Sequence, residues 1–240
     1  LIFLLLGLLF TGTSNAKIRI VASTSDIASI AESIGGELIK VDYICKGKSN
    51  PHSVEVLPSY MIKVTRADLY LKVGLELDFW ADAIIDGSRN GKLVIVDCSK
   101  GVNPLEVPTE KVDASMGDVH AQGNPHYWLN PDNGFQIALN ILNGLIQVDP
   151  SNSQVYQDGY NRFEALLIQK MEEWHKRAIS LKGKQIITFH NSWPYFAEAY
   201  GMVVAGFVEP KPGIEPTPSH TVKIIRMINA LNISIEFATA

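Results

Sequence analysis

Three of the six histidines in the chain have settings that suit transition-metal binding. His52 and His126 each follow an Asn-Pro pair, and His190 ends the apolar run of residues 185–190. Proline restricts its own φ angle and the residue before it, so a ligand in such a turn loses little entropy on binding. Neutral imidazole is the commonest protein ligand for metals, and three imidazoles with one oxygen ligand make a tetrahedral zinc site. The sequence therefore predicts a metal centre of His52, His126 and His190.

The other three histidines have weaker settings. His175 lies among charged residues and His220 near a helix start, so both are predicted to be exposed. His120 lies close to His126 and could capture metal transiently, but a tetrahedral site leaves little room for it as a direct ligand. A zinc-dependent hydrolase would need a general base close to the metal-bound water. No Glu or Asp adjoins the three histidine motifs in the sequence, which counts against that alternative.

Composition narrows the class of protein. The chain has 240 residues, of which 46% are hydrophobic and 19% charged, and this is typical of a globular protein. The net charge is −4 and no cluster of Lys and Arg is present, which argues against a nucleic-acid partner. Cys45 and Cys98 could pair in an oxidising compartment, and the alternative is two buried free thiols.

Strands and helices alternate in the first half of the chain. Apolar runs rich in β-branched residues predict strands at 18–23, 41–45, 69–74 and 92–98, with helices at 25–34 and 58–67. This alternation predicts a parallel sheet with helices on both faces. Residues 99–134 contain four prolines and four glycines and are predicted to form a long functional loop.

The second half predicts another α/β lobe beyond a long helix. A helix over 134–146 precedes a helical pattern at 151–181 that would be about 45 Å long, enough to join two lobes and pack along both. Strands follow at 185–190, 202–208 and 233–240, with helices at 193–201 and 220–231. The predicted division is an N-terminal lobe at 17–148, a linking helix at 149–182 and a truncated C-terminal lobe at 183–240. Ligands of open α/β sheets bind beyond the carboxyl ends of strands, where His52 and His190 lie.

The first residues are typical of a secretory signal. The apolar run of residues 1–10 is shorter than the roughly 20 residues that span a bilayer, and residues 14–16 (SNA) fit a cleavage site. The sequence predicts a partial signal peptide over 1–16 and a periplasmic mature protein. No cysteine stands at the cleavage point, so a lipid anchor is not expected.

These motifs resemble the solute-binding proteins of zinc and manganese ABC transporters, the ZnuA/TroA-like group. The resemblance covers nearly the whole mature chain and is carried by residues 50–53 (NPHS), 124–131 (NPHYWLNP) and 189–202 (FHNSWPYFAEAYGM). It implies two α/β lobes with parallel sheets, joined by one long backbone helix, and a metal held between them by His52, His126 and His190. The fourth ligand of the family is often an acidic residue beyond the point where this sequence ends; Glu209 and Glu215 are poor substitutes.

The resemblance implies a function as well. The chain is expected to be a monomeric periplasmic receptor, not an enzyme, that captures Zn²⁺ with high affinity and delivers it to a membrane ABC permease. Manganese-selective relatives tend to have a carboxylate in place of the third histidine, and a nitrogen-rich site favours zinc over manganese. The alternatives are a manganese or iron receptor, the hydrolase, and a metal-binding adhesin. Affinity is expected to fall below about pH 6.5, the ordinary histidine pKa.

Overall fold

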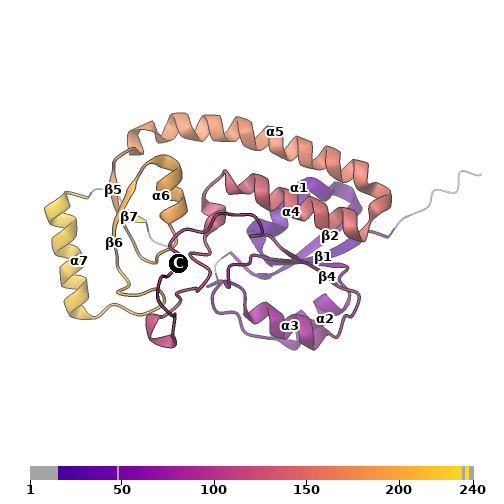
Figure 1. Cartoon of the computed structure of the whole chain (residues 1–240), viewed down its shortest axis with the longest axis horizontal. Coiled ribbons are helices and arrows are strands. Elements are labelled where there is room, and N and C mark those ends of the chain that lie inside the picture. Colours follow the sequence, from indigo (N-terminus) through magenta and orange to yellow (C-terminus); the bar gives the residue numbers. More distant parts are fainter. Residues whose placement is uncertain (1–15, 48, 234–235, 238–240) are drawn as a thin grey trace, which may run out of the picture.

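Two α/β lobes lie under one long helix (Figure 1). The computed structural model describes residues 16–47, 49–233 and 236–237, so residues 1–15 of the predicted signal peptide lie outside the described residues. Among the described helices, none has the length and apolar character needed to cross a bilayer. The predicted fold class, with parallel sheets flanked by helices and a long helix, is confirmed.

The N-terminal sheet is parallel, with the strand order β2-β1-β3-β4. Its strands are β1 (Ile18–Thr24), β2 (Ile39–Cys45), β3 (Leu69–Lys72) and β4 (Val94–Asp97). Successive side chains of a strand point to opposite faces. In β1, Ile20 and Ala22 therefore pack in one buried cluster with α1 (Ser25–Gly35) and α4 (Asn133–Val148). Val21 packs in another with α2 (Pro58–Thr65) and α3 (Trp80–Ser88), so helices cover both faces.

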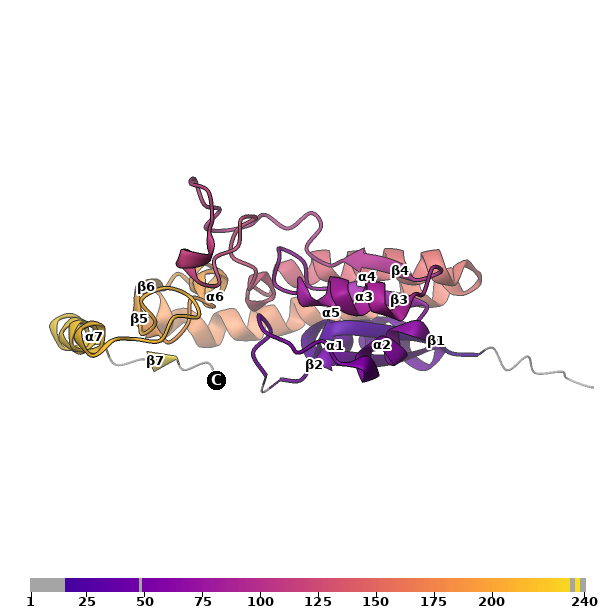
Figure 2. The ribbon, with the colours of Figure 1, turned by 90° about the horizontal axis from the view of Figure 1, so that it is seen from below.

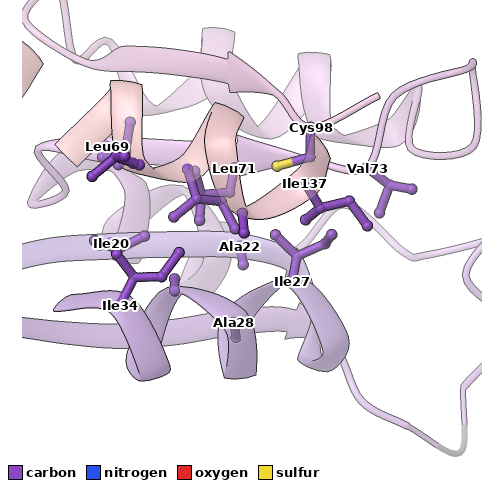
Figure 3. Packing of buried hydrophobic residues seen from close by; sticks show 14 of the residues in the cluster. Ile20, Ala22, Ile27, Ala28, Ile34, Leu69, Leu71, Val73, Cys98 and Ile137 are labelled. Carbon is purple, nitrogen blue, oxygen red and sulfur yellow. The ribbon is translucent and has the colours of Figure 1, made fainter. Parts of the chain in front are cut away.

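The two cysteines lie at opposite edges of this sheet. Cys45 ends β2 and Cys98 follows β4, with β1 and β3 between these strands. Three strand spacings separate the edges by about 14 Å, whereas a disulfide needs Cα atoms within about 7 Å. Both thiols are free and buried, and Cys98 points into the core beside Leu71 and Ile137 (Figure 3). The disulfide alternative is therefore wrong, and the alternative of two buried free thiols is confirmed.

The long helix α5 (Ser153–Ala178) is flanked by 3-10 turns at Pro150–Asn152 and Ile179–Leu181. Near its start Gly159 passes the backbone of Ile34 in α1. Near its end the ring of His175 lies 5.5 Å from that of Tyr200 in the second lobe. The helix thus contacts both lobes, as its length predicts.

The C-terminal lobe contains a smaller parallel sheet in the order β6-β5-β7. Its strands are β5 (Gln185–Thr188), β6 (Val203–Phe207) and β7 (Glu236–Phe237), with helices α6 (Pro194–Tyr200) and α7 (Pro218–Leu231). Residues 99–132 form the predicted loop, with 3-10 turns at Ala114–Met116 and Tyr127–Leu129. Figure 2 shows this loop, drawn in magenta, between the two lobes.

Helix α3 is the α-helix, among the described residues, that the sequence pattern does not predict. Phe79, which precedes it, makes no side-chain cap, and Gly87 lies near its end. The sequence therefore has no capping residue that would mark the start of this helix, and a glycine lowers the helix propensity near its end. The buried side chains of Ala81 and Ile84 hold it against the sheet.

The close approach of α5 to α1 yields a stability prediction. A Cβ atom at Gly159 would lie 2.0 Å from the Ile34 carbonyl oxygen, so Gly159→Ala must push the two helices apart. We expect this change to lower the free energy of unfolding by about 1–3 kcal/mol, as overpacking does. Urea unfolding measures it, with Gly91→Ala as the control because nothing lies within 4 Å of a Cβ there. Equal stabilities of Gly159→Ala and the unsubstituted protein would contradict this packing.

Candidate metal centre

His52, His126 and His190 come together from three distant segments. His52 lies in the turn after β2, His126 in the long loop, and His190 just after β5 of the other lobe. One ring nitrogen from each lies within 4.8 Å of the others. The three rings form a nearly equilateral triangle, with centroid separations of 5.1 Å, 5.0 Å and 5.3 Å. The structure therefore brings together all three residues that the sequence predicts as metal ligands.

Each Asn-Pro-His turn positions its histidine by the same local contact. The side-chain oxygen of Asn50 accepts a hydrogen bond from the backbone N–H of His52, at 2.9 Å. Asn124 does the same for His126, at 3.1 Å. Asparagine side chains favour such turns because they accept from the backbone two residues on. The Asn-Pro-His motif therefore fixes the backbone conformation at each of these two histidines.

The Nδ1 atoms of two rings are held by neighbouring acceptors. His126 Nδ1 donates to Asn124 Oδ1 at 2.9 Å, and His190 Nδ1 donates to Glu209 Oε2 at 2.7 Å. A neutral imidazole with its proton on Nδ1 has its lone pair on Nε2. Both rings therefore offer Nε2 as the ligand atom, and the outer hydrogen bonds fix their orientation, as is usual for metal-binding histidines.

His52 lies between two other imidazoles. Its Nε2 is 3.2 Å from His126 Nε2, and its Nδ1 is 3.1 Å from His120 Nε2. Without metal, His52 can donate its Nε2 proton to His126. A metal on His52 Nε2 requires the proton on Nδ1, where His120 is the acceptor. His120 thus faces the ring nitrogen of His52 that points away from His126, which suits an orienting partner rather than a direct ligand.

The spacing suits a small tetrahedral ion. Nitrogen ligands at 2.0–2.1 Å from tetrahedral zinc are about 3.3 Å apart. The Nε2 atoms of His52 and His126 already have this spacing, at 3.2 Å. The other separations are at most 4.8 Å, so a small approach of the lobe that carries His190 completes the geometry. The histidines border cavities of about 360 Å³ and 240 Å³.

Burial favours the neutral form of the His52 and His126 imidazoles. It lowers the pKa of His52 to about 3, helped by repulsion from charge on His190 and His120. Burial, with the neighbouring histidines, holds the pKa of His126 well below its usual range. Protons therefore compete weakly with a metal at these two rings. The expectation that affinity falls below pH 6.5 assumed ordinary histidine pKa values, and it stays a prediction that a zinc titration at two pH values tests.

The remaining candidate residues have different outcomes. His175 is exposed, as predicted, and contacts the Met171 carbonyl of its own helix at 2.8 Å. The prediction for His220 is wrong: it is half-buried, and its Nε2 donates to the Phe207 carbonyl at 3.1 Å. Glu215 is exposed. No carboxylate is next to the three histidine motifs in the sequence. In the structure, however, the carboxylate of Glu209 contacts His190.

Sequence reasoning missed Glu209, Asn124 and His120 as partners of the three rings. Glu209 follows β6, which pairs in parallel with β5, so both strands end at the edge where His190 lies. The predicted strands at 185–190 and 202–208 could have indicated that neighbourhood. No comparable signal pointed to His120, because its place depends on the course of a long loop.

The lowered histidine pKa values predict acid sensitivity of the metal-free protein. In the unfolded chain histidine binds a proton near pH 6.5, whereas His52 does so only near pH 3 and His126 well below its usual range. The unfolded state therefore binds more protons in this window, and stability falls as pH drops below 6.5, by up to about 1.4 kcal/mol per pH unit for each such histidine.

Urea unfolding at pH 7.5, 6.5 and 5.5 in a chelator measures this slope. His126→Gln should reduce it because one buried titrating group is removed. His175→Gln, at an exposed position, should leave it unchanged. An unchanged slope in His126→Gln would show that burial of this ring does not set the acid response.

Comparisons with known proteins identify the family of the chain. The family model described as ZnuA, zinc-uptake complex component A periplasmic, matches residues 20–240. The manganese-binding lipoprotein MntA of Halalkalibacterium halodurans is 29% identical over 234 residues, 95% of this chain and 73% of that protein. The iron ABC transporter substrate-binding lipoprotein MtsA of Streptococcus pyogenes serotype M1 is 29% identical over 249 residues, 98% of this chain and 77% of that protein.

A solved structure extends the likeness to three dimensions. The crystal structure of ZnuA superposes with a TM-score of 0.79 at 26% identity, covering 93% of this chain and 82% of that chain. The match of the family model covers almost all of the described residues and includes His52, His126 and His190. The chain therefore belongs to the ZnuA family.

Proposed function

We propose that the chain is the receptor of an ABC importer, which captures Zn²⁺ with His52, His126 and His190 and delivers it to a membrane permease. The observation that carries this proposal is the convergence of three imidazoles within 4.8 Å, from segments of both lobes. Two of them have Nδ1 committed to an acceptor and Nε2 turned to the shared point. Ligands divided between two lobes allow capture and release by a small relative movement of the lobes.

The donor set supports zinc as the ion. Imidazole nitrogen suits zinc, whereas manganese prefers oxygen ligands. The near-tetrahedral spacing of His52 and His126 points the same way. Manganese or iron is the second candidate, because the relatives MntA and MtsA are named for those metals.

The geometry supports a receptor rather than a hydrolase. The nearest carboxylate to a proposed ligand, Glu209, accepts from His190 Nδ1 at 2.7 Å and from the Gly213 backbone N–H at 2.8 Å. It therefore lies behind the imidazole and is not placed to take a proton from a metal-bound water, as a general base must. Assays of the zinc-loaded chain with ester, peptide and phosphate substrates should show no turnover.

The proposed receptor also has a cellular location and a domain organisation. The family description is periplasmic, and the named relatives are lipoproteins. We place the mature chain outside the cytoplasmic membrane, after cleavage of residues 1–16, as a monomer with lobes at 17–148 and 183–240. The 149–182 segment links them. A deletion strain grown under zinc chelation separates uptake from adhesion, since only a defect in uptake makes growth depend on added zinc.

Metal content tests the ligand set and the choice of metal together. Incubated with equal zinc, manganese and iron, the chain should retain zinc. His52→Ala, His126→Ala and His190→Ala should each lose more affinity than the roughly 10–100-fold effect of an outer partner. His175→Ala is the control and should bind as the unsubstituted chain does, because its exposed ring lies on α5. Retention of manganese or iron would reject zinc, and full binding by the three variants would reject the site.

The hydrogen bond behind His190 makes a separate prediction. Glu209→Gln replaces a charged acceptor with a neutral one, so it should weaken zinc binding by about 10–100-fold without abolishing it. Glu215→Gln is the matched control, since Glu215 is exposed on the same loop. Competition titration against a zinc chelator measures both. Equal affinities of the two variants would show that the Glu209 contact does not orient His190.

A further inference from the structure

A carboxylate outside the metal centre connects the two segments that carry His126 and His190. Glu106 Oε2 accepts a hydrogen bond from Asn124 Nδ2 at 2.9 Å and another from Asn191 Nδ2 at 2.8 Å. Asn124 lies two residues before His126, and Asn191 directly follows His190. Glu106 therefore bridges the long loop and the C-terminal lobe next to the histidines without being a ligand itself.

The contacts of Asn124 determine which way its amide points. Its Nδ2 faces two groups that can only accept, the Glu106 carboxylate and the Asn191 carbonyl oxygen, the latter at 2.9 Å. Its Oδ1 faces the backbone N–H of His126 at 3.1 Å, which can only donate. The amide oxygen must therefore lie on the His126 side, where each of these contacts pairs a donor with an acceptor.

This orientation fixes the proton on His126. With Oδ1 beside it at 2.9 Å, His126 Nδ1 must be the donor, and Nε2 is left with a lone pair that faces His52 and His190. A flipped amide would place an NH₂ group against Nδ1. The imidazole proton would then move to Nε2, where it blocks metal binding.

The backbone around Glu106 is held for this contact. Glu106 has φ of +53°, a left-handed conformation that is uncommon for residues other than glycine and that persists only where the surroundings impose it. The neighbouring Leu105 donates its backbone N–H to the buried Tyr195 hydroxyl at 2.9 Å and accepts from the Asn124 N–H at 2.8 Å. Tyr195 in turn donates to the Asn124 carbonyl at 2.7 Å. These hydrogen bonds fix the backbone next to Glu106 and so place the Glu106 carboxylate beside Asn124.

We infer that Glu106 is a positioning residue for metal capture, which holds the Asn124 amide in the orientation that keeps His126 Nε2 free of a proton. The inference rests on the proposed function, because it assigns Glu106 a part in binding at that site. It extends the chain of hydrogen bonds behind His126 by one member, from Asn124 to a carboxylate that also binds the segment of His190.

The test uses the full chain and three variants. In metal-free protein, long-range ¹H–¹⁵N NMR reports which nitrogen of His126 carries the proton. Glu106→Ala should populate the Nε2–H form and weaken zinc binding by about 10–100-fold. Glu106→Gln, whose amide oxygen can accept the same bonds, should restore most of the affinity and the Nδ1–H form. Glu110→Ala is the matched control, because Glu110 is exposed in the same loop and accepts no hydrogen bond among the described residues.

Two results would overturn the inference. One is a Glu106→Ala variant that keeps both the Nδ1–H form and the affinity. The other is a loss of affinity with the His126 proton unmoved, which would reveal a purely structural role; urea unfolding checks that each variant is folded. If the unsubstituted chain fails to bind zinc, the receptor proposal fails, whereas the NMR measurement still tests the part of Glu106 without metal.

Discussion

The arrangement depends on the hydrogen bonds that occupy the Nδ1 atoms of buried imidazoles. A buried histidine must be neutral and must face the ion with an unprotonated nitrogen if it is to bind a metal. Burial provides the first condition at His52 and His126, since it disfavours the charged ring. Acceptors on Nδ1 provide the second at His126 and His190, through Asn124 and Glu209. Neither condition concerns the metal itself, so His126 offers an unprotonated, neutral nitrogen before an ion arrives, whereas His52 must still move its proton from Nε2 to Nδ1.

Polar contacts close to this site join the two lobes. Between α5 and the lobes lies a cavity of about 800 Å³ with a largely apolar lining, so the interior there is not continuous. Close to the histidines, by contrast, the Tyr195 hydroxyl of one lobe bonds to the Leu105 N–H and the Asn124 carbonyl of the loop. Hydrogen bonds of this kind are directional, and they fix the approach of the lobes more strictly than apolar packing does. The long helix determines how far the two lobes extend, and the polar contacts fix the lobes close to the three histidines.

The kinship with zinc, manganese and iron proteins shows that one fold serves several ions. MntA and MtsA are equally similar to this chain, at 29% identity, yet their names refer to different metals. Selectivity must therefore come from the donor atoms and the groups behind them rather than from the architecture. In this chain the three converging donors are nitrogens, and the carboxylate of Glu209 lies behind His190. That arrangement is the reason why zinc is the ion in the proposed function.

Local features of the chain could be predicted from the amino-acid sequence. The periods of apolar residues indicated the strands and helices, and the Asn-Pro-His turns identified two proposed ligands, because each feature depends on residues close together in the chain. Helix α3 could not be predicted from the sequence, because the packing of Ala81 and Ile84 stabilises it rather than a capping residue. The three-dimensional structure was needed to show that His120 contacts His52, that Glu209 contacts His190 and that Cys45 and Cys98 lie at opposite sheet edges. Each of these pairs lies 19 or more positions apart in the chain, and its geometry follows from strand order and loop course, which no local pattern encodes.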